Sequence, residues 1–192
     1  GVRFGPPDSP VTIRTEWRGD PLALADVEIV SVRGCDVQPL DATDPAVEAR
    51  LLAYVWPETP ARAERLTRAI AMQRACGVDL ARADAADWLE ARLAEPQQAG
   101  VTRVLTHSVV WQYLPEDSAN RIRAAMAAAG ARARAERPLG WVMMEPNRAF
   151  AQQIVRVRSL PWHDEWQVLA TAHAHGTWVK NGIFEEDRRP IE

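Results

Sequence analysis

The chain has 192 residues, of which 47% are hydrophobic and 26% are charged, and its formal net charge is −3. This composition is typical of a soluble globular protein and excludes a disordered chain, and no apolar run reaches the ~18 residues that a membrane-spanning helix needs. The acidic charge balance argues against a nucleic-acid partner, and two cysteines, Cys35 and Cys76, are too few for a disulfide scaffold.

The two ends of the sequence bear on localisation and on the extent of the folded domain. Gly1 opens a segment that has neither the charged nor the apolar region of a signal peptide. Because no secretory signal is seen and cysteines are few, we expect a cytoplasmic protein with no membrane partner. Residues 185–192 are polar and are expected to form a tail outside the folded domain.

Two strands and two helices are expected in the first half of the chain. Alternating apolar and polar residues predict a strand over residues 11–17, and the β-branched run over residues 28–32 predicts a second. Asp44-Pro45 and Thr59-Pro60 predict helix starts, because each joins a side-chain acceptor at the N-cap to a proline whose missing N–H is not needed there.

Strands and helices alternate more regularly in the second half. Strands are predicted over residues 78–82, 101–106 and 139–144, and helices are predicted to begin at Asp84 and at Pro115. This order of elements indicates an α/β protein with largely parallel strands.

The last two predicted strands are expected to pair as an antiparallel hairpin. Residues 153–158 and 167–172 both alternate apolar and polar side chains, and Pro161-Trp162-His163-Asp164 lies between them. We therefore predict a mostly parallel sheet with flanking helices that ends in a C-terminal antiparallel hairpin.

Four segments follow predicted strands, where an open parallel sheet binds its ligands. They are Gly34-Cys35-Asp36, Ala83-Asp84, His107-Ser108 and Glu145-Pro146-Asn147. Asp84 is either the N-cap of a helix or an acceptor for an amine or hydroxyl of a ligand, and both roles can coexist. Asp36 is either a ligand contact or a solvated turn residue.

Residues 107–115 form the most distinctive stretch, because a histidine and two aromatic residues follow a strand end. His107 as a neutral imidazole would serve as a general base, and Trp111 and Tyr113 would wall a flat ligand. A core histidine among packing aromatics is the alternative. Ser108 lacks the G-x-S-x-G turn of a hydrolase nucleophile.

His173 and His175 would place two imidazoles on one face of an extended strand. Such a pair would begin a zinc or iron site if His107, His163 or an acidic residue supplied a further ligand. The spacing matches no zinc signature, so we expect no metal. The sequence also contains no G-x-G-x-x-G motif and no Walker loop.

Several motifs resemble a bacterial family of unknown function, domain-of-unknown-function family 2332. The motifs that carry this resemblance are Asp8-Ser9-Pro10-Val11, Glu16-Trp17-Arg18-Gly19, Arg33-Gly34-Cys35-Asp36, Pro39-Leu40-Asp41-Ala42-Thr43-Asp44, Tyr54-Val55-Trp56-Pro57, Ala83-Asp84-Ala85-Ala86-Asp87-Trp88, residues 107–115 and His175-Gly176-Thr177-Trp178-Val179. The resemblance covers nearly the whole chain and names no reaction.

The second half also resembles class I S-adenosylmethionine-dependent methyltransferases. This resemblance implies a single Rossmann-like domain over residues 1–184 and S-adenosylmethionine as cofactor. It places Asp84 at the adenine amine and the segment from His107 to Tyr113, including Trp111, at the methyl-donor pocket. The acid that binds the ribose would be Asp36 or Glu16.

The first strand and glycine-rich loop of the methyltransferase pattern are absent from this sequence. The resemblance therefore implies a domain that lacks its N-terminal part and is inactive as this chain. Removal of a central strand would expose sheet edges, which favours pairing with a second copy or another chain.

Three functions agree with these patterns. The leading one is methyl transfer from S-adenosylmethionine to a small molecule, with His107 or Glu145 removing a proton from the acceptor. The second is a non-catalytic α/β binding or interaction module. The third is a metal-dependent hydrolase that uses His173 and His175.

Overall fold

The computed structural model describes residues 3–20, 23, 25–147 and 152–181. Residues group into two compact units. Unit 1 consists of Gly1–Arg14 and Val27–Ala83, and unit 2 consists of Thr15–Asp26 and Asp84–Glu192. The single domain expected over residues 1–184 stays a prediction, and the tail expected over residues 185–192 lies outside the described residues.

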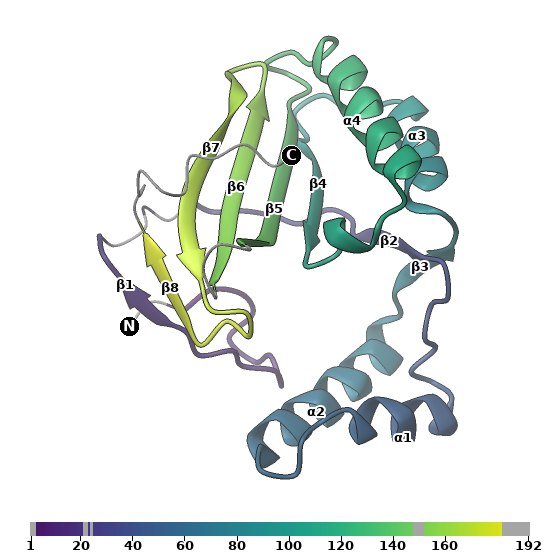
Figure 1. Cartoon of the computed structure of the whole chain (residues 1–192), viewed down its shortest axis with the longest axis vertical. Helices are drawn as coiled ribbons and strands as arrows, with labels where there is room; N and C mark the ends of the chain where they lie inside the picture. Colours follow the sequence, from purple (N-terminus) through teal and green to yellow (C-terminus); the bar gives the residue numbers. More distant parts are fainter. Residues whose placement is uncertain (1–2, 21–22, 24, 148–151, 182–192) are drawn as a thin grey trace. The chain divides into compact units, whose positions relative to one another are not determined.

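Unit 1 combines two helices with a pair of parallel strands (Figure 1). Its elements are β2 (Arg33–Asp36), α1 (Pro45–Ala53), α2 (Pro60–Cys76) and β3 (Asp79–Arg82). In the parallel pair, Arg33 lies opposite Asp79 and Asp36 lies opposite Arg82. The two helices form the crossover that parallel pairing requires.

Both helices of unit 1 begin where the sequence predicts, but only one of them has a side-chain cap. Asp44 accepts a hydrogen bond from the amide of Ala46 at 2.8 Å, as an N-cap carboxylate should. Thr59 precedes α2 without capping it, because its hydroxyl instead donates to the carbonyl of Trp56 at 2.8 Å.

The strand predicted over residues 28–32 is wrong, since these residues have no regular secondary structure and β2 begins at Arg33. Three apolar residues of this segment, Ile29, Val30 and Val32, are 62–74% exposed. β-Branched side chains favour extended backbone, but a strand also needs a neighbour that supplies its hydrogen bonds.

Unit 2 is built on a six-stranded sheet in the order β1-β8-β7-β6-β5-β4. Its strands are β1 (Glu16–Arg18), β4 (Arg103–Ser108), β5 (Leu139–Asn147), β6 (Gln152–Leu160), β7 (His163–Ala172) and β8 (Trp178–Asn181). The pairs β1–β8 and β4–β5 are parallel, whereas β5–β6, β6–β7 and β7–β8 are antiparallel.

The α/β class is confirmed, but the prediction of a mostly parallel sheet is wrong, because this sheet is mixed. Strands β5 to β8 follow one another through short connections, which join antiparallel neighbours and cannot return the chain for a parallel pair. The predicted C-terminal hairpin is confirmed, since β6 and β7 pair in antiparallel register with Gln153 opposite Ala172.

Only the last two residues of the strand predicted over residues 11–17 belong to a strand in the structure. Residues 11–15 are not in a strand, and β1 occupies one edge of the sheet beside β8. Strand β8 was not predicted from the sequence. The adjoining turn is closed by hydrogen bonds from the amide of His173 to the carbonyl of Trp178 and from the amide of Gly176 to the carbonyl of His173.

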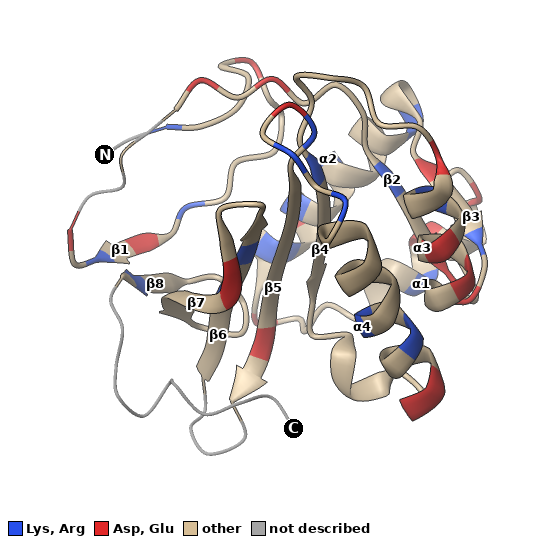
Figure 2. Cartoon of the chain, turned by 90° about the horizontal axis from the view of Figure 1, so that it is seen from above, with Lys and Arg blue, Asp and Glu red and all other residues tan. Residues whose placement is uncertain are grey.

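Two helices cover one face of the sheet over β4 and β5 (Figures 1 and 2). They are α3 (Ala85–Ala94) and α4 (Glu116–Gly130), and α4 buries Ile122 and Met126 as predicted. The core between helices and sheet consists of Ala86, Leu89, Ile122, Met126, Ala133, Leu139, Trp141, Met143 and Leu160. Arg121 of α4 ties the helices together by ion pairs with Asp87 and Glu90 of α3.

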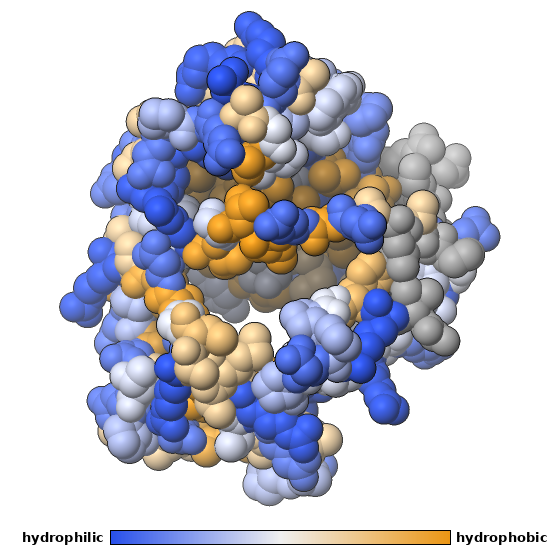
Figure 3. All heavy atoms as spheres, turned by 180° about the vertical axis from the view of Figure 1, so that it is seen from behind, coloured by the Kyte–Doolittle hydropathy of each residue, from blue (hydrophilic) through white to orange (hydrophobic). Residues whose placement is uncertain are grey.

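Some apolar side chains stay exposed, and the space-filling view shows such side chains on the surface (Figure 3). In unit 2, Val104 is 50% exposed and Leu169 is 45% exposed. Val104 lies on the edge strand β4 and alternates with Leu105, which packs against the core. Among the helices of the described residues, none combines the length and hydropathy that a bilayer crossing requires.

Candidate functional site at the ends of β4 and β5

The candidate site lies where β4 and β5 reach their carboxyl ends side by side. The two strands are parallel, with Leu105 opposite Trp141 and His107 opposite Met143. Side chains on a strand alternate between faces, so His107 shares the helix-covered face with Trp141 and Glu145. The fold thereby brings together two of the side chains that the sequence analysis named as catalytic, His107 and Glu145.

His107 is held by a hydrogen bond at each ring nitrogen. Its Nδ1 lies 2.7 Å from Oε1 of Glu145, and the indole N–H of Trp141 donates to its Nε2 at 3.0 Å. Because an indole can only donate, Nε2 must be unprotonated, and the ring proton is assigned to Nδ1, which donates to the carboxylate. In this arrangement neither nitrogen of His107 has a lone pair ready for a substrate proton.

Glu145 is a buried carboxylate whose two oxygens differ in the number of hydrogen bonds that they accept. Its side chain is 9% exposed, and its Oε1 accepts from His107 and from the amides of Val110 at 3.2 Å and Trp111 at 3.3 Å. Val109 turns the chain toward it with a positive φ of 52°. Oε2 is buried and has no hydrogen-bond partner within the described residues. The site therefore contains one unused buried acceptor.

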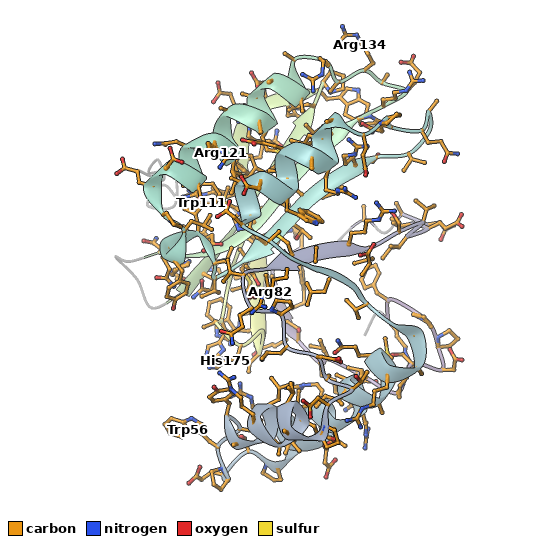
Figure 4. The ribbon with its side chains drawn as sticks, turned by 90° about the vertical axis from the view of Figure 1, so that its right-hand side faces the viewer. Trp56, Arg82, Trp111, Arg121, Arg134 and His175 are labelled. Atoms are coloured by element: carbon orange, nitrogen blue, oxygen red, sulfur yellow. The ribbon has the colours of Figure 1, made fainter. Side chains whose placement is uncertain are left out.

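Aromatic rings surround the His107–Glu145 pair. Trp111 stacks on His107 with 5.3 Å between ring centroids, and Trp141 lies 5.7 Å from Trp111. The guanidinium of Arg123 lies 5.0 Å from the centroid of the Trp111 ring (Trp111 is labelled in Figure 4). Tyr113 does not join this group, because its side chain is 75% exposed. Trp111 and Tyr113 belong to the short 3-10 helix η1 (Trp111–Tyr113).

Asp84 caps α3, which confirms one of its two predicted roles. Oδ1 accepts from the amides of Ala86 at 2.8 Å and Asp87 at 3.3 Å, and Oδ2 accepts from the Ser118 hydroxyl at 3.1 Å. Burial by itself would raise the pKa of Asp84, but these hydrogen bonds and the charge of Arg121 outweigh it, so the pKa is lowered. Its contact with a ligand stays a prediction.

Asp84 and Trp111 both lie against the first half of α4. Asp84 contacts Ser118 in the first turn of this helix, and Trp111 lies under Arg123, five residues further along α4. The two residues thus meet the same helix, although Asp84 follows β3 of the two-stranded sheet and Trp111 follows β4 of the six-stranded sheet. Ser118 and Trp141 were not recognised from the sequence, although the placement of Trp141 in an apolar strand was a visible signal.

Replacing Asp84 with alanine is expected to lower the free energy of unfolding by about 1–2 kcal/mol, because the amides of Ala86 and Asp87 would lose their acceptor. Asp84→Asn retains a capping oxygen and is expected to lose less than half as much. Urea denaturation at neutral pH measures both values. Equal losses in the two variants would contradict the cap as the main role of this side chain.

The lowered pKa of Asp84 also predicts how stability depends on pH. The ionised carboxylate stabilises the fold above about pH 4, the pKa of an unfolded aspartate, and this contribution is lost as the pH falls through the folded pKa. The stability difference between wild type and Asp84→Asn is therefore expected to shrink in acid. An unchanged difference at low pH would show that the charge does not contribute.

The two candidate ribose-binding acids lie in different units. Asp36 ends β2 in unit 1, where it is exposed and accepts from the amide of Gln38 at 2.7 Å, as a turn carboxylate does. Glu16 lies on β1, at the opposite edge of the unit 2 sheet from β4. A hydrogen bond from Arg18, reinforced by its charge, lowers the pKa of Glu16. Within unit 2, Glu16 is thus separate from the His107–Glu145 pair.

The prediction of two imidazoles on one face of an extended strand is wrong. His173 and His175 lie in the turn after β7, where the amide of His175 donates to Nδ1 of His173 at 3.1 Å. Their ring centroids are 5.6 Å apart. In the part of the chain that the structure describes, no group of three His, Cys, Asp or Glu side chains is arranged to hold a metal ion.

Comparison with known proteins identifies a family and no activity. No curated protein and no solved structure matches the chain significantly. The model of a family described as an uncharacterized protein conserved in bacteria, DUF2332, matches residues 1–181. Because this match spans most of the sequence and agrees with the motifs noted above, the chain belongs to the DUF2332 family.

Proposed function

We propose that this protein is a cytoplasmic Rossmann-like enzyme that transfers a methyl group from S-adenosylmethionine to a small molecule. One observation carries the proposal. His107 and Glu145 meet at the carboxyl ends of two adjacent parallel strands, and Oε2 of Glu145 is a buried acceptor without a partner in the described residues. In α/β sheets, ligand-binding groups stand at such strand ends.

The acidic side chains of unit 2 offer hydrogen-bond acceptors that match donor groups of S-adenosylmethionine. The amine and hydroxyl groups of this cofactor are hydrogen-bond donors, and within unit 2 Asp84 and Glu145 carry carboxylate oxygens that can accept such bonds. When bound, the cofactor supplies a methyl group on a positively charged sulfonium. A negatively charged carboxylate such as that of Glu145 is suited to this positive charge.

Of the two predicted catalytic residues, Glu145 is better placed to receive a proton. The lone pair on Nε2 of His107 is taken by Trp141, so His107 acts here by holding the carboxylate in one orientation. Oε2 of Glu145 has no hydrogen-bond partner among the described residues, so in this proposal it takes the proton from a hydroxyl or amine of the acceptor. Methyl transfer depends mainly on alignment of donor and acceptor, so a rigid site contributes through positioning.

Calorimetric titration with S-adenosylmethionine tests this proposal. We expect the wild type to bind and Glu145→Gln to weaken binding about tenfold, because a charge-assisted interaction is worth about 1.5–3 kcal/mol. Glu16→Gln removes the same charge at the opposite edge of the sheet and serves as the matched control. Absence of binding to the wild type, or equal affinities in all three proteins, would overturn the proposal.

A non-catalytic binding module is the second candidate. It is favoured by the engagement of both His107 nitrogens and by the exposed Val104 on β4, an edge strand of its sheet. An open strand edge favours pairing with a second copy. Self-association in analytical ultracentrifugation, together with no binding heat in the S-adenosylmethionine titration, would support this candidate over the enzyme.

A further inference from the structure

We propose that unit 2 contains a second site, a cavity that binds a small organic anion. The cavity has a volume of about 270 Å³ and lies where the C-terminal ends of α3 and α4 meet the start of β4. Its polar lining consists of Glu95, Gln97, Arg103, Arg132 and Arg137. Arg103 and His107 are four positions apart on β4, so the cavity is about 13 Å along the strand from the His107–Glu145 pair.

Arg103 neutralises the negative end of α3. Its guanidinium donates to the carbonyls of Arg92 at 3.0 Å, Glu95 at 3.1 Å and Pro96 at 3.2 Å. The carbonyl groups at the end of a helix carry partial negative charge and would repel an anion. Because Arg103 covers them, the helix end does not oppose the binding of an anion in the cavity.

The acidic residue of the lining is already paired. Oε1 of Glu95 lies 2.8 Å from Nη1 of Arg92, a residue that does not line the cavity. The lining therefore contains three arginines and one glutamate, and the charge of this glutamate is balanced by Arg92, which lies outside the lining. The electrostatic balance of the lining favours a negatively charged ligand.

Arg132 and Arg137 are held in place but keep donors for a ligand. Nη1 of Arg132 donates to the carbonyl of Ala128 at 2.9 Å, and Nε of Arg137 donates to the carbonyl of Gln97 at 3.0 Å. Neither guanidinium has a carboxylate partner within the described residues. The two Nη groups of Arg137, and Nε and Nη2 of Arg132, are thus donors on side chains already fixed by a first hydrogen bond.

The loop that carries these arginines is itself closed by backbone hydrogen bonds. The amide of Arg137 donates to the carbonyl of Arg134 at 2.9 Å, and the amide of Arg134 donates back at 3.3 Å. The amide of Gly100 donates to the carbonyl of Glu136 at 2.7 Å, which anchors the loop to the segment before β4. This fixed backbone lowers the ordering cost of binding.

The remaining lining defines the class of ligand. Leu93 and Leu139 are among five apolar residues in the cavity wall. Guanidinium groups bind carboxylates and phosphates through paired N–H donors, and an apolar wall accommodates a ring or short aliphatic chain. The structure thus points to a carboxylate or phosphate monoester with a small apolar body.

Titration with phenyl phosphate, benzoate and neutral benzyl alcohol, followed by amide chemical shifts, tests this site. We expect both anions, or one of them, to bind and to shift amides of Gln97, Arg132 and Arg137, and benzyl alcohol to bind at least tenfold more weakly. The affinities of phenyl phosphate and benzoate then distinguish a phosphate from a carboxylate ligand. Failure of both anions to bind at about 10 mM would overturn the proposal.

Variants separate specific contacts from general charge. Arg132→Gln together with Arg137→Gln is expected to weaken anion binding at least tenfold. Arg134→Gln removes the same charge from the same loop, outside the cavity lining, and is expected to change affinity less than threefold (Arg134 is labelled in Figure 4). If Arg134→Gln weakened anion binding as much as the double variant does, the proposed site would be wrong.

Thermal stability and a lysine double variant control for loss of folding. Arg132 and Arg137 are exposed, so their replacement is expected to leave thermal stability close to that of the wild type. Replacing both residues with lysine retains the charge and loses the planar pair of donors, and intermediate affinity is expected. Wild-type affinity in both double variants would show that the arginines do not bind the ligand.

Discussion

Replacement of Glu145 with leucine is expected to lower the free energy of unfolding by about 3 kcal/mol. The carboxylate oxygen Oε1 accepts from His107 and from the amides of Val110 and Trp111, and the leucine side chain would leave all three donors without this acceptor. Each partly or fully buried donor that loses its partner costs about 1–3 kcal/mol, with the lower end applying to the less buried amides. Urea denaturation measures the loss.

Glu145→Gln is the matched control for this prediction. It keeps an oxygen for the three donors but places an NH2 group where Oε2 has no partner in the described residues, so we expect a loss of about 1 kcal/mol. If glutamine destabilised the protein as much as leucine does, the negative charge, and not the set of hydrogen bonds, would be the main contribution of Glu145.

Replacement of Trp141 with alanine is expected to cost about 3–5 kcal/mol, the range for removal of a large aromatic side chain from a core. Trp141 is 4% exposed and contacts Trp111 and Trp166 with centroid distances of 5.7 and 4.9 Å. Trp141→Phe keeps an aromatic ring and removes the donor to Nε2 of His107, so it is expected to cost about 1–3 kcal/mol.

The exposed Trp162 provides the comparison for these core variants. Its side chain is 58% exposed, and its replacement with alanine is expected to change stability by no more than about 0.5 kcal/mol. Thermal or urea unfolding of the three tryptophan variants gives the ranking. A loss for Trp162→Ala as large as that for Trp141→Ala would contradict the assignment of the core to the helix-covered face.

The candidate site was predicted in part because some of its signals are local. His107 and Glu145 each follow a run of strand-forming residues, so the carboxyl-end rule singled them out separately. Their contact, across 38 positions, was not predictable from either segment. The indole N–H that donates to Nε2 of His107 belongs to Trp141, which was predicted only as an apolar residue of a strand.

The sequence by itself determined where helices begin and which segments form the C-terminal hairpin. Asp44 and Asp84 are next to the amides that they cap, and the residues of β6 and β7 are separated by one short turn, so the interactions responsible are local. The same local reasoning overextended the first strand and misplaced the second, because strand formation depends on a neighbour.

Only the tertiary structure decided the order and direction of the strands. β1 pairs with β8 from the other end of the chain, and the short connections after β5 make the sheet mixed. Strand pairing and the hydrogen-bond chain from Trp141 through His107 to Glu145 join residues far apart in sequence. Their geometry depends on packing between helices and sheet, which no single segment of the sequence specifies.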